Sequence, residues 1–330
     1  MERKLISLVI PVYNEDAALE FFLETVCTIV APEPYDFEFV FVNDGSKDDT
    51  LAKLMVAHEK DSRVKIIDLS RNFGKEQALA AGLRVASGDA VIPMDVDLQD
   101  PPELIAAFLR KWEEGYQVVL GVRRARISDS FFKRKSAAMF YRIFQTLCDH
   151  SLVPNAGDYR LLDRAALDAL NAMPERVRFT KGMYAWVGFR QALVYYDRPA
   201  RVAGVSKWSV WKLWNFALDG ITSFSTLPLR MWGYVGTVIA LVGFIYAAFL
   251  VGRTLLYGSD MPGYPSLMVV LLTLGGLILM SMGILGEYLG RVYEEAKRRP
   301  LYVVQGYIGV DAPKSKICPC CGQTLPDSDG

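Results

Sequence analysis

The stretch FEFVFVNDG, residues 37–45, decides the fold: a run of Phe and Val ends abruptly at Asn, Asp and Gly. Such continuous apolar content is typical of a strand that is buried on both faces, as in parallel sheets covered by helices. The surrounding sequence repeats the pattern. Strands are expected at residues 5–13, 64–70, 89–97 and 116–123, and helices at 15–29, 53–60, 75–86 and 103–115. This alternation predicts βαβ units and an α/β, Rossmann-like domain with a mostly parallel sheet.

Polar residues gather where these expected strands end, at Asn14-Glu15, at residues 43–45, at residues 70–72 and at Asp95 to Asp97. In open parallel sheets, ligands bind beyond the carboxyl ends of the strands. The sequence therefore predicts the functional site at this edge of the sheet.

The carboxylates in IPMDVDLQDPPEL (92–104) suit a metal ion. If the strand continues through them, Asp95 and Asp97 point to the same side, and Gln99 extends that row. Mg²⁺ and Mn²⁺ prefer such oxygen ligands, together with substrate phosphates. Asp100, which precedes Pro101, is instead expected to cap the next helix.

Bulk composition excludes several classes. The 330 residues carry 37 basic and 37 acidic side chains, so no strong field argues for nucleic acid, while 52% are hydrophobic. The apolar N-terminus contains a Pro and lacks a small-x-small cleavage site, which favours a first strand over a signal peptide. The hydrophobic excess lies near the C-terminus and points to a membrane.

Two uncharged stretches, 231–252 and 264–286, are each long enough to span a bilayer. Arg230 before the first and the basic EYLGRVYEEAKRRP (287–300) after the second place both ends in the cytoplasm. The alternative is a pair of buried core helices. Residues 206–229, with three Trp, are expected to form amphipathic helices in the membrane interface; the alternative is a helix packed on the soluble domain.

The expected domains are a cytoplasmic α/β domain (1–205), interfacial helices (206–229), two transmembrane helices (230–290) and a cytoplasmic tail (291–330). The tail contains Cys318 and Cys321 in CPCCG, the spacing of half a zinc ribbon. A Zn²⁺ site and a disordered tail with reactive thiols both remain open.

Five motifs occur in order: PVYNED (11–16), VNDGSKDDT (42–50), SRNFGKE (70–76), GDAVIPMDVDLQDPPEL (88–104) and GDYR (157–160). Together they resemble the family 2 inverting glycosyltransferases with the GT-A fold, in particular the polyprenyl-phosphate group that includes bactoprenol glucosyltransferases and dolichyl-phosphate mannose synthases. The resemblance runs from about residue 5 to residue 300.

The resemblance implies a role for particular residues. The uracil and ribose of a UDP-sugar would be held by Pro11, Tyr13, Glu15 and Asp44. The nucleotide and its diphosphate would be met by Gly74, Lys75 and Asp95. The Mg²⁺ or Mn²⁺ ligands would be Asp95, Asp97 and Gln99.

The acceptor phosphate would be met by Arg123, Lys133, Lys135, Arg201 and Lys207. The catalytic residues would be Asp97 and Asp158. Relatives with sugar acceptors place a general base at Asp158, but a phosphate monoester is already largely ionised near pH 7. We therefore expect Asp158 mainly to orient the acceptor or the sugar.

The implied activity is metal-dependent, inverting transfer of a hexose, with glucose favoured, from a UDP-sugar to polyprenyl (undecaprenyl) phosphate. A homo-oligomer at the cytoplasmic face of the plasma membrane is expected. Three alternatives stay open: transfer from GDP-mannose, a processive polysaccharide synthase, and a scaffold with an inactive domain. The synthase would need a QxxRW motif, which the sequence lacks.

Overall fold

The computed structural model describes residues 3–124, 153, 156–173, 175, 180–197, 227–257 and 263–310. Several sequence predictions fall outside these ranges: Lys133, Lys135, Arg201, Lys207, Cys318, Cys321 and the interfacial segment up to residue 226.

The catalytic part is one eight-stranded sheet in the order β7-β5-β6-β4-β1-β2-β3-β8. The strands are β1 (Leu5–Val12), β2 (Asp36–Asn43), β3 (Val64–Leu69), β4 (Ala90–Pro93), β5 (Val118–Arg123), β6 (Ala156–Asp163), β7 (Gln191–Tyr196) and β8 (Val304–Ile308). The central strands β3, β2, β1 and β4 are parallel, whereas β6 and β8 run antiparallel to their neighbours. The predicted α/β fold with a mostly parallel sheet is confirmed.

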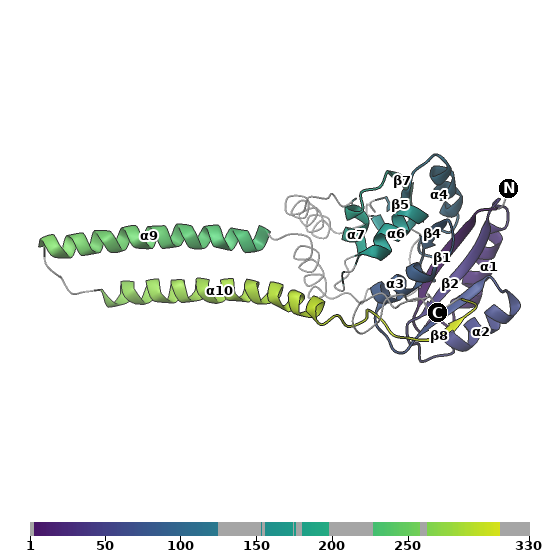
Figure 1. Cartoon of the computed structure of the whole chain (residues 1–330), viewed down its shortest axis with the longest axis horizontal. Helices are drawn as coiled ribbons and strands as arrows, with labels where there is room; N and C mark the ends of the chain where they lie inside the picture. The colour runs from purple at the N-terminus through teal and green to yellow at the C-terminus, as the bar shows by residue number, and fades with distance from the viewer. Residues whose placement is uncertain are drawn as a thin grey trace, which may run out of the picture.

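Helices cover both faces of this sheet (Figure 1). One face packs against α1 (Leu19–Val30), α2 (Thr50–Lys60) and α4 (Leu104–Glu113). The other packs against α3 (Lys75–Val85), α6 (Arg164–Ala172) and α7 (Thr180–Trp186). The strands are buried on both sides because each face has its own apolar core, which is why their sequences are almost continuously apolar.

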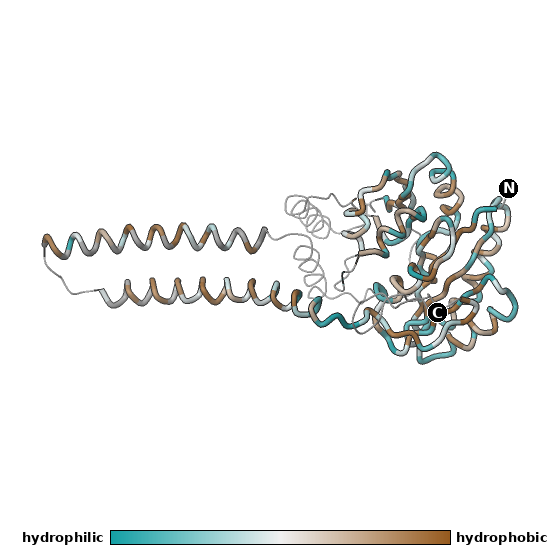
Figure 2. The backbone as a smooth tube through the Cα atoms, in the orientation of Figure 1, coloured by the Kyte–Doolittle hydropathy of each residue, from teal (hydrophilic) through white to brown (hydrophobic). Residues whose placement is uncertain are grey.

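Two long helices leave this domain side by side: α9 (Leu227–Tyr257) and α10 (Tyr264–Ala296) (Figure 1). Apolar residues recur along both, and polar residues collect where α10 approaches the catalytic domain (Figure 2). Among the described residues, one helical stretch, Thr273–Ala296, is long and apolar enough to cross a membrane.

The strand that was expected at residues 89–97 is shorter than predicted. Strand β4 ends at Pro93, and the chain then turns: Leu98 has φ +50°, and the Gln99 amide donates to Asp97 Oδ1 at 3.1 Å. The period-2 argument for the row of Asp95, Asp97 and Gln99 was therefore wrong, because these residues lie in a turn beyond the strand.

The segment after α10, which was expected to be part of a tail, supplies β8. This strand pairs with β3 and forms the edge of the catalytic sheet. The chain thus returns from the helical hairpin to complete the domain that it left.

Candidate functional site

The loops after β1 and β2 are joined by hydrogen bonds at the carboxyl edge of the sheet. The Asn14 amide donates to Ser46 Oγ (3.0 Å), and the Lys47 amide donates to Asn14 Oδ1 (2.8 Å). The Glu15 amide donates to Thr50 Oγ1 (3.0 Å). These contacts fix the predicted motifs PVYNED and VNDGSKDDT as one unit.

The loop after β2 is held just as closely to the loop after β3. The carboxylate of Asp44 accepts the backbone N–H groups of Phe73 (2.7 Å) and Gly74 (2.9 Å). Burial raises the pKa of Asp44 in spite of these two bonds. Gly45 has φ +65°, and a Cβ there would lie 2.4 Å from the Arg71 carbonyl carbon. Only a glycine permits this approach of the two loops.

A pocket of about 560 Å³ opens between these loops. That volume suits a small-molecule site. Its walls come from the ends of β1, β2 and β3 with the loops that follow them, from the start of α2 and from β8: Tyr13, Asn43, Gly45, Ser46, Lys47, Leu51, Asp68, Leu69, Ser70, Arg71, Asn72 and Gln305. Asn43 Nδ2 donates to Asp68 Oδ1 at 2.7 Å, so two polar side chains of the wall orient one another.

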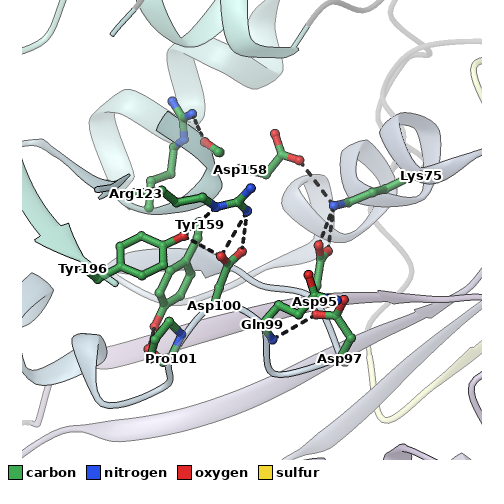
Figure 3. Close-up of polar contacts among 12 residues, drawn as sticks. Lys75, Asp95, Asp97, Gln99, Asp100, Pro101, Arg123, Asp158, Tyr159 and Tyr196 are labelled. Atoms are coloured by element: carbon green, nitrogen blue, oxygen red, sulfur yellow. Dashed lines mark hydrogen bonds and ion pairs between the residues drawn. The ribbon is translucent and has the colours of Figure 1, made fainter. Parts of the chain in front are cut away.

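Beside this pocket lies a cluster of carboxylates around one cation. Lys75 Nζ lies 2.7 Å from Asp95 Oδ1 and 3.3 Å from Asp158 Oδ2, and Figure 3 shows the ammonium pointing between the two acids. Burial alone would lower the pKa of Lys75, but the two carboxylates outweigh it and raise that pKa. Lys75 is therefore a fixed positive charge at this position.

The carboxylates around Lys75 outnumber its single positive charge. Burial raises the pKa of Asp95, and repulsion from Asp158 and Asp97 adds to the effect of burial although Lys75 opposes it. Burial, followed by repulsion from Asp97, Asp48 and Asp95, also raises the pKa of Glu15. The site thus carries negative charge that a divalent cation would offset.

These donors fit Mg²⁺ or Mn²⁺ bound together with a substrate. Within the described part of the chain, no three His, Cys, Asp or Glu side chains group as a complete metal site. Asp95 and Asp97 supply hard oxygen ligands, however, and such ions are held by one or two carboxylates plus substrate phosphates. Gln99 lies in the same turn, beside Asp97 (Figure 3).

Asp100 has a different role from the predicted helix cap. Helix α4 begins at Leu104 with Glu103 as its N-cap, so Asp100 is too far upstream to cap it. Asp100 is buried instead, accepts a hydrogen bond from Tyr196, and lies 3.0 Å from Arg123 Nη2 (Figure 3). The prediction was wrong because these partners come from β5 and β7, far along the chain.

Asp100 thus forms an ion pair with Arg123, the residue that the family resemblance assigned to the acceptor phosphate. Its guanidinium also donates to the Tyr196 hydroxyl at 2.9 Å. The charge of Arg123 is therefore compensated by Asp100 in this structure.

The predicted residues thus divide into two neighbouring groups. Lys75, Asp95 and Asp158 are in direct contact, while Tyr13 is the predicted residue that lines the pocket. Pro11 lies within β1, opposite Val42. Sequence reasoning placed Asn43 and Arg71 at this edge of the sheet without assigning them a role, and it missed Asp68 and Gln305. Asp68 lies one residue before the end of β3, a signal that could have found it, but Gln305 carried none.

Two family models and several known proteins match this sequence. The family model Glycosyl transferase family 2 matches residues 7–170, and the model GtrB C-terminal hairpin matches residues 227–292. An uncharacterized glycosyltransferase of Synechocystis is 50% identical over 93% of this chain and 96% of its own length. The bactoprenol glucosyl transferase of Shigella phage SfV is 48% identical over 91% of this chain and 98% of its own length.

A solved structure is similar at a lower level. The glucosyl-3-phosphoglycerate synthase of Mycobacterium tuberculosis, in complex with Mn²⁺, UDP and glucosyl-3-phosphoglycerate, gives a TM-score of 0.44. It is 20% identical and covers 66% of this chain and 78% of its own. The sequence relatives match over both the catalytic part and the hairpin, which confirms the predicted resemblance: the chain is a glycosyltransferase and belongs to glycosyl transferase family 2.

Proposed function

We propose that this enzyme transfers glucose from UDP-glucose to a polyprenyl phosphate, with inversion, at the cytoplasmic face of the plasma membrane. One observation carries the proposal: relatives named bactoprenol glucosyl transferase are 48% identical over 91% of the chain, a length that includes catalytic domain and hairpin together. Undecaprenyl phosphate is the proposed acceptor.

The donor fits the two neighbouring parts of the site. The pocket at the ends of β1, β2 and β3 would take the uridine, and the diphosphate would reach Lys75 and the acids beside it. Asp95 and Asp97, with Gln99 beside them, would hold Mg²⁺ or Mn²⁺. A bound metal ion offsets the negative charge that develops on the departing UDP.

The residues of the chain prepare this reaction by position and charge. Lys75 holds a positive charge between Asp95 and Asp158, where a diphosphate would otherwise meet only carboxylates. Asp158 orients the acceptor phosphate or the sugar, since a phosphate monoester with a second pKa of about 6 needs little deprotonation.

The acceptor phosphate would be bound by basic residues. Lys133, Lys135, Arg201 and Lys207 remain the proposed ligands, with Arg123 available only if its pairing with Asp100 is exchanged. Arg suits a phosphate by bidentate geometry and Lys as a point charge.

The hairpin would span the membrane twice. Helices α9 and α10 have 31 and 33 residues, lengths of about 46 and 50 Å, against about 30 Å of hydrocarbon. Large apolar side chains such as Phe249 of α9 and Leu279 of α10 are exposed. Arg230 before the apolar stretch of α9, and Lys297 to Arg299 after α10, would keep both ends in the cytoplasm. A homo-oligomer is also proposed.

Incubation of membranes with radiolabelled UDP-glucose, undecaprenyl phosphate and Mg²⁺ or Mn²⁺ tests the function. The expected product is extractable into organic solvent and labile to mild acid. It should be absent with EDTA and with Asp95→Asn. A water-soluble polymer would indicate a processive synthase, label from GDP-mannose alone would indicate a mannosyltransferase, and no product from any nucleotide sugar would contradict the proposal.

Asp158→Asn separates two roles for this residue. If Asp158 only orients the substrates, the variant loses activity equally at every pH. A change in the shape of the pH–kcat profile would instead identify Asp158 as a general base.

A further inference from the structure

The strand β8 belongs to the catalytic sheet although it follows the hairpin in sequence. It runs antiparallel to β3 and forms the sheet edge beside the pocket, where Figure 1 draws it as the yellow arrow. The Ser70 amide donates to the carbonyl of Val303 at 2.9 Å, which extends the pairing into the loop that lines the pocket.

The pairing of β8 with β3 contains a bulge at Gln305. Asp68 pairs with Gly306 and the next residue, Leu69, pairs with Val304, so Gln305 is the extra residue on the β8 side. A bulge releases one residue from the ladder and re-aims its side chain, and bulges are frequent beside active sites. Gln305 is exposed and forms part of the pocket wall together with Asn43 and Asp68.

The end of β8 is anchored, so the position of Gln305 is built into the fold. Gly309 has φ +69°, and a Cβ there would lie 2.6 Å from Cε1 of His58 on α2. The ring of His58 is itself fixed by a 2.6 Å hydrogen bond to the Val64 carbonyl at the start of β3. Ile308 packs against the apolar core.

We propose that Gln305 binds the nucleoside of the donor and is a donor-binding residue contributed from beyond the hairpin. This rests on the proposed function, in which the pocket holds the uridine. The amide of Gln305 offers both a donor and an acceptor, which suit the carbonyl and N–H groups of uracil and the hydroxyl groups of ribose. Asp68 on the opposing strand is partly committed to Asn43. Gln305 adds a side-chain amide to this wall from a different segment of the chain.

Titration of full-length protein with UDP by calorimetry tests this inference. Gln305→Ala should raise the Kd for UDP by roughly three- to tenfold, the effect of one or two neutral hydrogen bonds. Gln305→Glu has nearly the same size but loses the amide donors and adds a negative charge to the pocket of an anionic ligand, so it should weaken binding at least as much. The control is Val303→Ala, an exposed side chain of the same segment that does not line the pocket.

If Gln305 only stabilised the fold, its replacement would lower the melting temperature and not specifically weaken the binding of UDP. In the transfer assay, Gln305→Ala should raise KM for UDP-glucose and leave kcat unchanged, and the melting temperature without nucleotide should equal that of the wild type. Equal Kd values for wild type and Gln305→Ala would overturn this inference alone. No binding of UDP by the wild type would overturn the proposed donor site, and this inference with it.

Discussion

Lys75 Nζ lies 2.7 Å from Asp95 Oδ1, so the proposed metal ligand already has a cation beside it. Lys75→Gln removes this competitor. We expect Mn²⁺ alone to bind more tightly to the variant, while kcat/KM for UDP-glucose falls about 100-fold because a charge aimed at the diphosphate is lost. Mn²⁺ titration and steady-state kinetics measure the two effects. Lys75→Arg, which keeps the charge, is the control, and weaker Mn²⁺ binding by Lys75→Gln would contradict the prediction.

Alanine substitutions at Gly45 and Gly115 distinguish the cost of a positive φ from the cost of a collision between the two loops. Both have positive φ, +65° and +90°, but a Cβ at Gly115 meets nothing within 4 Å, whereas one at Gly45 collides with the backbone of Arg71. Gly115→Ala should cost about 1–2 kcal/mol of stability and leave UDP affinity unchanged. Gly45→Ala should cost more and abolish UDP binding. Thermal unfolding measures the loss of stability, and calorimetry measures the affinity for UDP. Equal UDP affinity in the two variants would refute the assigned loop contact.

Asp100 and Arg123 should behave as an energetically coupled pair. Arg123→Ala leaves the buried Asp100 carboxylate without its cation, and we expect a loss of about 3 kcal/mol, somewhat reduced because Arg123 is partly exposed. The double variant Asp100→Ala/Arg123→Ala should lose less than the sum of the single variants, by about 1–3 kcal/mol. Denaturant unfolding in detergent measures this. Strict additivity would show that the pair contributes nothing.

The buried carboxylate of Glu38 should make the free energy of unfolding depend on pH. Glu38 lies within β2, is buried, and accepts hydrogen bonds from Ser7, Lys65 and Ser87. Burial opposes ionisation of Glu38, but these bonds outweigh it and lower its pKa. Because the folded pKa lies below the unfolded value of about 4.3, this stabilisation is present above that pH and is lost as pH falls through the folded pKa.

Glu38→Gln tests this by thermal unfolding across pH. The variant should be less stable than the wild type at pH 7, and the difference should shrink as the pH is lowered below about 4.3. A difference that stays constant down to pH 3 would contradict the assignment. Glu24→Gln, on the exposed side of α1, is the control.

The central strands and the position of the site could be predicted because the information is local. An apolar run that stops at polar residues, as at Asn43, records both the burial of a strand and its carboxyl end. Lys75 and Asp158 were found only through resemblance to the family, since 83 residues of sequence separate two side chains that meet in space.

The remaining features depend on long-range contacts that a local pattern cannot encode. Asp100 looked like a helix cap because Pro residues follow it, yet Tyr196 and Arg123 arrive from other strands. The turn after Pro93 depends on the φ of +50° at Leu98, and a leucine in the sequence does not predict a positive φ. Gln305 sits in a short segment whose pairing with β3 is set only when the chain has folded back.

That return of the chain has a mechanical consequence. Seven residues, Lys297 to Val303, join the end of α10 to β8, and they can reach at most about 25 Å. If α10 is seated in the bilayer as proposed, its polar last turns and this short connection hold the donor pocket close to the membrane surface. A lipid-borne acceptor and the active site then meet at the same membrane surface, so their encounter depends on the surface density of the acceptor in the bilayer and not on its concentration in bulk solution.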